Sequence, residues 1–213
     1  MALTIAIDGP AASGKGTLAR RLARHLNLAH LESGLLYRAV AQRMLAAHLD
    51  PKDATAAEAA ARQVSFAELS DPALREEAIS TAASVVSAHP AVRAALKALQ
   101  RDFAAHPPAG AQGVVIDGRD IGTVICPDAG VKIFLEASPE IRAERRVREL
   151  RQRGGKAISS RVLQDMKDRD TRDRDRRVSP LKPAEDAFIL DTTDLDEDGA
   201  FQAALSFIEA RNK

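Results

Sequence analysis

The sequence predicts an α/β fold in which a parallel, largely buried sheet is covered by helices on both faces. Short runs of continuously apolar, often β-branched residues alternate with longer segments of helical period, which is typical of parallel strands joined by helices. A glycine-rich turn also joins the first apolar run to the first helical segment. The expected strands span residues 3–7, 28–32, 113–117, 130–136 and 187–191.

Hydrophobic periodicity predicts the first helices. Leu18, Leu22 and Leu26 repeat every four residues, so a helix follows the glycine-rich turn. A second helix is expected to begin at Ser33 and Gly34, to continue through Leu45 and to end at Asp50-Pro51. Residues 54–106 are rich in alanine and contain few β-branched or aromatic residues. They are therefore expected to form a mainly helical insertion between core strands.

Start and stop signals mark the later helices. Ser138, Pro139 and Glu140 supply an N-cap, a first-turn proline and an early acid, so a helix begins here and should continue to Arg153. Two glycines at 154–155 break it. Two more helices are expected, over residues 159–177 and 196–210, the last with Phe201, Leu205 and Ile208 turned inward.

Composition limits the class of protein. The chain has 213 residues, enough for one sizeable core, and its net charge of +1 does not indicate a whole-surface affinity for nucleic acid or membrane. Aromatic residues make up only 3%, so base recognition by several stacked rings is not expected. Cys126 is the single cysteine, which excludes an intramolecular disulfide and fits a reducing cytoplasm. No apolar stretch approaches ~20 residues, so we expect a cytoplasmic protein without a membrane span.

The glycine-rich turn has the spacing of a phosphate-binding loop (P-loop), Gly9-x4-Gly14-Lys15. Glycines let backbone N–H groups converge on phosphate oxygens, and the following helix points its positive dipole end at the same place. Lys15 adds a mobile positive charge for the outer phosphates. The alternative is a turn that binds nothing. The residues expected to bind phosphates are Gly9, Pro10, Ala11, Ala12, Ser13, Gly14, Lys15, Gly16 and Thr17.

Magnesium ligation departs from the general P-loop pattern. A serine or threonine usually follows the lysine directly and holds Mg²⁺. Here Gly16 follows Lys15, and Thr17 comes one place later. We therefore expect phosphates and waters to hold Mg²⁺, with Asp8 or Asp117 outside them.

A second polar set follows the strand at 113–117. Asp117 ends that strand, and in P-loop enzymes such an acid often faces the nucleotide metal. Arg119 can grip a phosphate with two hydrogen bonds, while Asp120 helps to hold it in place. An ordinary polar turn is the alternative.

A third polar pair lies at the start of the second helix. Ser33 places a hydroxyl there, and Arg38 follows just over one turn later, so one phosphate monoester could sit between them. The alternative is a capped helix with a solvated arginine.

Residues 167–177 alternate arginine and lysine with aspartate. Arg169, Asp173 and Arg176 have helical spacing and should share one face. One interpretation is a solvated ladder of i,i+4 ion pairs. The other is a short charged lid that hinges at residues 154–155 and closes over a transferring phosphoryl group.

Several stretches together resemble the bacterial cytidylate kinases, which belong to the P-loop nucleoside monophosphate kinases. The Gly-Lys-Gly-Thr sequence looks like the variant that these kinases use, and the matching stretches run in the same order nearly end to end. They are residues 7–10, 13–17, 33–38, 82–84, 90–93, 117–123, 169–174 and 180–181.

The resemblance implies a three-layer P-loop NTPase fold with a five-stranded parallel sheet, and transfer of phosphate from ATP to CMP or dCMP. It implies a core of residues 1–33, 113–152 and 178–213, a helical monophosphate-binding insertion at 34–112 and a lid at 153–177. The implied cofactor is Mg²⁺ with ATP as co-substrate. We expect a monomer that binds no nucleic acid and no membrane.

The same resemblance implies roles for single residues. Lys15, Arg119, Arg169 and Arg176 would be catalytic. Ser33, Arg38 and Arg119 would hold the monophosphate, whereas Ser84, Arg93 and Asp120 would read the cytosine edge. Arg169 and Asp173 would contact ribose and phosphate. By composition alone Ser84 and Arg93 would be an ordinary surface hydroxyl and arginine.

Three alternatives stay open at this point. Another small P-loop kinase could act on UMP, AMP or a hydroxyl acceptor such as shikimate, in which case Asp117 or Asp120 could serve as a base. A nucleotide-dependent switch would order loops around the γ-phosphate. Nucleic-acid binding through residues 142–177 is a third reading, disfavoured because acids are interleaved with the arginines.

Overall fold

The computed structural model describes residues 2–211. Met1 and residues 212–213, which the expected core includes, lie outside the described residues. In chain order the elements are β1 (Leu3–Asp8), α1 (Lys15–His25), β2 (Ala29–Glu32), α2 (Gly34–Ala46), α3 (Ala54–Ala61), η1 (Phe66–Ser70), η2 (Pro72–Arg75), α4 (Glu77–Val86), α5 (Pro90–Ala105), β3 (Gly113–Gly118), η3 (Ile121–Ile125), β4 (Val131–Glu136), α6 (Pro139–Gln152), α7 (Ser159–Arg174), β5 (Phe188–Asp191) and α8 (Glu197–Arg211).

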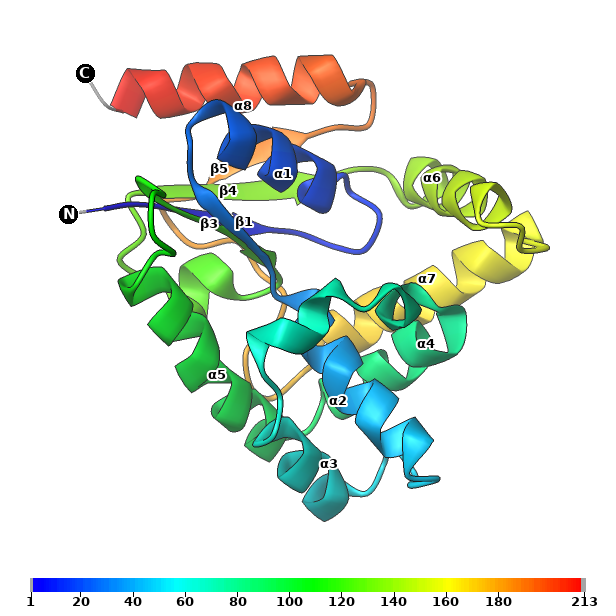
Figure 1. The fold of residues 1–213 in the computed structure, drawn as a ribbon. Coiled ribbons are helices and arrows are strands. Elements are labelled where there is room, and N and C mark those ends of the chain that lie inside the picture. Colours follow the sequence, from blue (N-terminus) through cyan, green and yellow to red (C-terminus); the bar gives the residue numbers. More distant parts are fainter. Residues whose placement is uncertain (1, 212–213) are drawn as a thin grey trace. The chain divides into compact units, whose positions relative to one another are not determined.

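The five strands form one sheet in the order β2-β3-β1-β4-β5, with β1 at its centre (Figure 1). β1 pairs in parallel with both β3 and β4, and β4 pairs in parallel with β5. The expected five-stranded parallel sheet is confirmed. Ile7 lies opposite Asp117, and Asp8 lies opposite Gly118. The carboxyl ends of β1 and β3 therefore meet at one edge, which is where parallel α/β sheets bind ligands.

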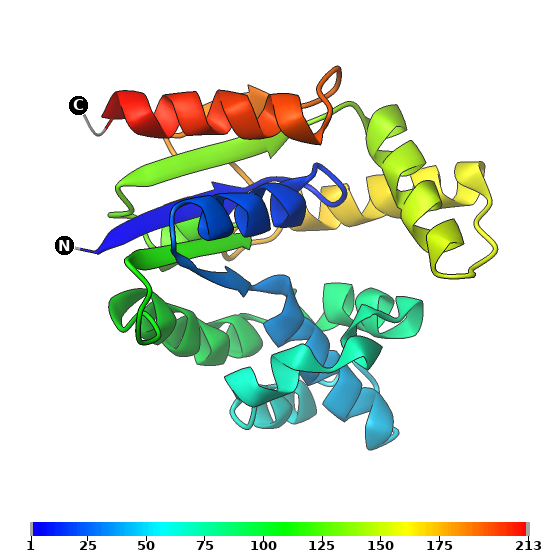
Figure 2. The same ribbon diagram turned by 45° about the horizontal axis from the view of Figure 1, so that its top comes forward.

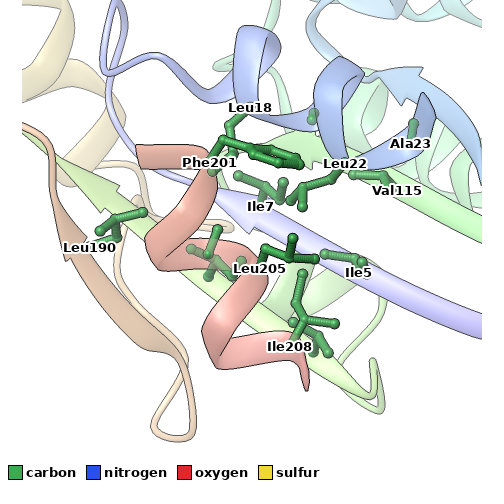
Figure 3. Packing of buried hydrophobic residues seen from close by; sticks show 14 of the residues in the cluster. Ile5, Ile7, Leu18, Leu22, Ala23, Val115, Leu190, Phe201, Leu205 and Ile208 are labelled. Carbon is green, nitrogen blue, oxygen red and sulfur yellow. The ribbon is translucent and has the colours of Figure 1, made fainter. Parts of the chain in front are cut away.

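Two helices, α1 and α8, pack together on one face of the sheet (Figure 2). Figure 3 shows the side chains between them and the strands: Leu18 and Leu22 come from α1, and Phe201, Leu205 and Ile208 come from α8. All five are buried, so the inward face predicted for the last helix is confirmed. This apolar layer fixes the start of α1, and with it the P-loop, against the sheet.

The opposite face of the sheet carries the alternate residues of each strand. Ala6 and Ile116 are fully buried there. The single turn of η3 packs against β1 and β3, and Lys132 of β4 lies beneath Gly122 of that turn. The Lys132 ammonium forms an ion pair with Asp186 at 2.9 Å.

The chain divides into two compact units. The first contains the residues up to Leu31 and from Pro107 onward, and the second contains Glu32–His106. Residues 107–112 belong to the first unit because they turn back onto Asn27. The Asn27 side chain donates to the Gly110 carbonyl at 3.2 Å, and the Gln112 N–H donates to the Asn27 carbonyl at 2.9 Å.

The second unit is mainly helical, as the alanine-rich composition predicted. Within it, α2 packs on α4, and α3 packs on α5. The Asp53 side chain caps α3 by accepting from two backbone N–H groups. Two short 3₁₀ helices, η1 and η2, separate α3 from α4, and Asp71 caps the second of them.

The prediction for the helix over residues 159–177 was wrong in its length. α7 ends at Arg174, so Arg176 does not lie on a helical face with Arg169 and Asp173. The chain turns back on the helix because the Leu181 N–H donates to the Asp173 carbonyl at 2.8 Å.

No helix among residues 2–211 is both long enough and apolar enough to cross a membrane.

Candidate active site

Backbone geometry shows why glycine is needed in the P-loop. At Gly9, with φ of 146°, a Cβ atom would stand 2.3 Å from the Leu135 carbonyl oxygen of β4, so no side chain fits. Gly14 begins α1 in the left-handed region, with φ of 93°. Ala12 adopts φ of 57°, which an L-residue rarely does. The loop thus holds a specific, partly strained conformation.

Three carbonyl groups of the P-loop accept hydrogen bonds from side chains. The Pro10 carbonyl accepts from Lys15 Nζ at 2.6 Å. The Ala11 carbonyl accepts from Arg142 at 3.3 Å, and the Ser13 carbonyl accepts from the Thr192 hydroxyl at 3.2 Å. In a planar trans peptide the N–H points opposite to the C=O. The last two contacts therefore turn the N–H groups of the following residues away from Arg142 and Thr192.

Lys15 is buried at the centre of a charged cluster. Burial lowers its pKa well below the usual value, and the nearby positive charges of Arg119 and Arg169 lower it further. Asp117 and Asp8 act in the opposite direction but do not outweigh them. Three cations held close together in a low-dielectric setting favour the binding of an anion, which would remove their mutual repulsion.

Asp8, at the end of β1, is buried and accepts two backbone hydrogen bonds. They come from the N–H groups of Ile121 at 2.8 Å and Gly122 at 2.7 Å. Burial raises the pKa of Asp8 to about 7, although the bonds from Gly122 and Ile121 lower it. Asp8 therefore ties η3 to the end of β1, and its role outside a metal's waters stays a prediction.

The raised pKa of Asp8 predicts a pH-dependent stability. Between about pH 4 and 7 the folded protein holds a proton on Asp8 that the unfolded chain releases, so this stabilisation is complete at low pH and is lost as the pH rises through 7. In Asp8→Asn the loss is absent. We expect the free energy of unfolding of the wild type, minus that of Asp8→Asn, to fall by about 2–3 kcal/mol from pH 5 to pH 8. Urea unfolding without nucleotide measures it, and a constant difference would contradict the prediction.

Asp117 has a partner that the sequence analysis missed. His30 Nε2 lies 2.7 Å from Asp117 Oδ1, and both side chains are mostly buried. The contact forms because β2 and β3 are neighbours in the sheet. The one sign of this contact in the sequence was the polar His30 within the mainly apolar strand at 28–32.

Arg119 and Asp173 form an ion pair. Arg119 Nε donates to Asp173 Oδ2 at 3.0 Å, and Arg176 lies 3.4 Å from the other carboxylate oxygen. Burial alone would raise the pKa of Asp173, but the charges of Arg119, Arg176 and Arg169 outweigh it and hold that pKa below its usual value. Arg176 thus joins the cluster from the turn after α7 rather than from the helix itself.

A second buried ion pair joins α6 to α7, and the sequence analysis did not predict it. Arg142 of α6 and Asp170 of α7 lie 2.6 Å apart, and both are almost completely buried. Arg142 also donates from Nε to the Ala137 carbonyl at 3.0 Å. The run of alternating charges therefore is not simply a solvated ladder, because Asp170 and Asp173 are both buried.

The predicted CMP-binding residues of the second unit lie on three of its helices. Ser33 precedes α2 and is buried, and Arg38 NH1 donates to the Leu74 carbonyl at 3.0 Å. Arg93 of α5 is buried, donates to the Ser87 carbonyl at 3.2 Å and stacks over the Tyr37 ring.

Ser84 is the most informative residue of this group. Its hydroxyl is buried on α4 and has no hydrogen-bond partner within residues 2–211. A buried hydroxyl without a partner is costly, and a ligand that bonds to it offsets this cost. Ser84 and Arg93 are therefore not the surface residues that composition alone suggested.

In the part of the chain that the structure describes, no group of three or more His, Cys, Asp or Glu side chains is arranged to bind a metal ion such as Mg²⁺. Thr17 Oγ1 accepts from Arg20 at 3.5 Å. Asp117 and Asp8 lie close enough to Lys15 for their negative charges to raise its pKa. This donor set fits a Mg²⁺ ion that is bound by phosphates and waters and steadied by carboxylates further out.

Comparison with known proteins decides the family. The cytidylate kinase family model matches residues 5–210. This chain belongs to the cytidylate kinase family. A cytidylate kinase of Paramagnetospirillum magneticum is 56% identical to it, over 99% of this chain and 100% of the relative. One from Rhodospirillum rubrum is 54% identical, over 99% of each chain.

Solved structures support the fold. A shikimate kinase from Bacteroides thetaiotaomicron aligns with a TM-score of 0.51 at 14% identity, covering 98% of this chain and 99% of that one. A gluconokinase from Sinorhizobium meliloti aligns with a TM-score of 0.53 at 14% identity, covering 98% and 92%. At such identities the likeness shows the shared fold alone, and the family assignment rests on the cytidylate kinase relatives.

Proposed function

We propose that this cytidylate kinase family member transfers the γ-phosphoryl group of ATP to the phosphate of CMP or dCMP at the site built around the P-loop. The observation that carries the proposal is a group of cations in which the buried Lys15 lies near the half-buried Arg119 and Arg169. Burial and these neighbouring charges lower the pKa of Lys15. Such a group is unfavourable without an anion and suits the charge that spreads over a transferring phosphoryl group.

Catalysis by this site depends on positioning and charge. The acceptor phosphate is already an anion near neutral pH, so the reaction does not demand a strong base. The P-loop N–H groups and Lys15 would hold the ATP phosphates, and Arg119 and Arg169 would offset the repulsion between the two nucleotides. Mg²⁺, when bound with ATP, would neutralise charge on the β- and γ-phosphates. Arg176 would add a further charge near the transferring group.

The CMP-binding roles are carried over as part of the proposal. Ser33, Arg38 and Arg119 would hold the monophosphate, and Arg169 and Asp173 would contact the ribose and phosphate. Ser84, Arg93 and Asp120 would read the cytosine edge. The Ser84 hydroxyl, which has no hydrogen-bond partner among the described residues, supports this role.

The segment boundaries are proposals of the same kind. Residues 34–112 would be the monophosphate-binding insertion, and residues 153–177 would be the lid. The second compact unit, Glu32–His106, covers most of the first of these segments. A monomeric state and a cytoplasmic location stay predictions from the sequence.

A panel of acceptors tests the proposed function. The full chain is incubated with Mg²⁺ and ATP and with CMP, dCMP, UMP, AMP, dTMP or shikimate in turn, and ADP release is measured. We expect CMP and dCMP to be turned over far faster than the other acceptors. Faster turnover of shikimate or AMP would contradict the proposal, and binding of nucleotide without transfer to any acceptor would favour a switch.

Substitution of Ser84 tests the cytosine-reading role. Because its hydroxyl has no partner among the described residues, Ser84→Ala should leave the stability unchanged or slightly higher. The same change should lower kcat/KM for CMP by about 2- to 13-fold, the value of one neutral hydrogen bond. Thermal unfolding and initial rates measure the two effects.

Ser80→Ala is the matched control, since Ser80 is equally buried one turn earlier on α4. It should leave kcat/KM for CMP unchanged. An unaltered kcat/KM in Ser84→Ala would remove Ser84 from the proposed site.

A further inference from the structure

Arg142 occupies a position that the proposed chemistry does not use. Its guanidinium lies between two parts of the first unit and makes three polar contacts at once. Nε donates to the Ala137 carbonyl, NH1 donates to the Ala11 carbonyl of the P-loop, and NH2 pairs with Asp170 of α7. The side chain is 3% exposed, so water does not compete for these contacts.

The contact with Ala11 bears directly on the P-loop. It fixes the plane of the peptide between Ala11 and Ala12, and thereby the direction of the Ala12 N–H. Ala12 is also the residue of the loop that has a left-handed backbone without being a glycine. Any change in this peptide on phosphate binding alters the acceptor that Arg142 NH1 uses.

The contact with Asp170 bears on α7. Only 5% of the Asp170 side chain is exposed, and its second carboxylate oxygen has no hydrogen-bond partner in the described part of the chain. The ion pair with Arg142 is thus the strongest polar attachment of this carboxylate. On α7, Asp170 directly follows Arg169, and Asp173 comes one turn after it. Arg169 and Asp173 are the residues of this helix that join the charged cluster around Lys15 and Arg119.

We propose that Arg142 is a positioning residue that couples occupation of the P-loop to the placement of α7, through a buried bridge from the Ala11 carbonyl to the Asp170 carboxylate. The planar guanidinium suits this role because its donors have fixed directions, so a shift at one acceptor changes the geometry at the others. This inference rests on the proposed binding of ATP phosphates by residues 9–17. It adds the route by which that binding brings Arg169 into place.

Hydrogen–deuterium exchange of the full chain, with and without Mg·ADP, tests the proposal. ADP fills the P-loop without reacting. In the wild type we expect exchange to slow in the peptides that cover residues 9–25 and also in those that cover α7. For α7 the slowing should be at least about fivefold, the low end for coupled sites.

Three variants break the bridge in different ways. Arg142→Lys keeps the charge but cannot serve three acceptors in one plane. Asp170→Asn keeps the shape and removes the charge. The double variant Arg142→Gln/Asp170→Asn leaves no unpaired buried charge, so it preserves folding where a single change does not. In each we expect ADP to slow exchange in residues 9–25 as before, whereas the response of α7 is lost.

Matched controls lie on α6, away from the bridge. Arg148→Lys changes an exposed arginine, and Glu149→Gln removes an acid that forms ion pairs with Arg146 and Arg153. Both should keep the wild-type response of α7.

The outcomes separate this inference from the proposed function. If residues 9–25 are not protected by Mg·ADP in the wild type, the proposed phosphate site and the inference both fail. If they are protected but α7 does not respond, the inference alone fails. It also fails if α7 responds equally in the three bridge variants, because direct contact of α7 with the nucleotide would then explain the effect.

Discussion

Lys15→Met is expected to abolish most of the phosphoryl transfer while leaving the fold intact. Lys15 lies at the start of α1, and its pKa is lowered first by its burial and further by the positive charges of Arg119 and Arg169. Its positive charge would stabilise the transition state most, because negative charge develops there on the γ-phosphoryl group. Removing one such group costs about 10²–10³-fold in kcat in comparable sites. Initial rates with saturating ATP and CMP measure it.

Stability should not fall with the loss of this charge. Methionine has a similar length, and replacing a buried ammonium by an apolar group relieves both its desolvation and the repulsion from Arg119 and Arg169. Thermal unfolding should therefore give an equal or higher Tm. Lys182→Met, at an exposed position, serves as the control and should keep wild-type rates. A Lys15→Met protein that retains most of its activity would exclude the proposed role of this lysine.

Arg119→Lys is expected to give the second largest effect, on the use of CMP. Arg119 follows β3, and it donates to the Asp173 carboxylate at 3.0 Å and to the Gly118 carbonyl at 3.2 Å. Lysine keeps the positive charge but cannot hold Asp173 and a phosphate together through a planar fork. We expect kcat/KM for CMP to fall by about 10²-fold, the upper range for a charge-assisted hydrogen bond.

The comparison of constants distinguishes binding from general damage. KM for ATP should change much less than kcat/KM for CMP, because Arg119 is proposed to hold the acceptor. Arg148→Lys, an exposed arginine on α6, is the control and should behave as the wild type. Equal losses toward both nucleotides, together with a lowered Tm, would indicate that Arg119 acts through the structure instead.

Much of the fold could be predicted because the relevant signals are local. The five strands agree with their predicted ranges to within one or two residues, since each is a short apolar run that cannot be mistaken for a long amphipathic helix. The start of α6 was also correct, because Ser138 caps it by accepting from the Ile141 N–H. The end of α7 was predicted wrongly. The charge pattern continues to residue 177, but the hydrogen bond from the Leu181 N–H to the Asp173 carbonyl accompanies an earlier end of the helix.

The candidate site was predictable only in part. The P-loop is read from glycine and lysine spacing, which reflects local backbone requirements such as the close approach of Gly9 to Leu135. The tertiary contacts of the site residues could not be predicted from such spacing. His30 reaches Asp117 across 87 positions of sequence, and no spacing rule joins them.

The sequence by itself determined the order of strands and helices, the phosphate-binding loop and the family to which the chain belongs. These depend on backbone preferences and on the period of apolar residues, which act over a few neighbouring positions. Only the tertiary structure decided that Arg142 bridges the P-loop to α7 and that Arg176 joins the charged cluster from a turn. Arg142 and Ala11 are 131 positions apart, and such partners are chosen by the packing of whole elements on the sheet rather than by either residue's own surroundings in the chain.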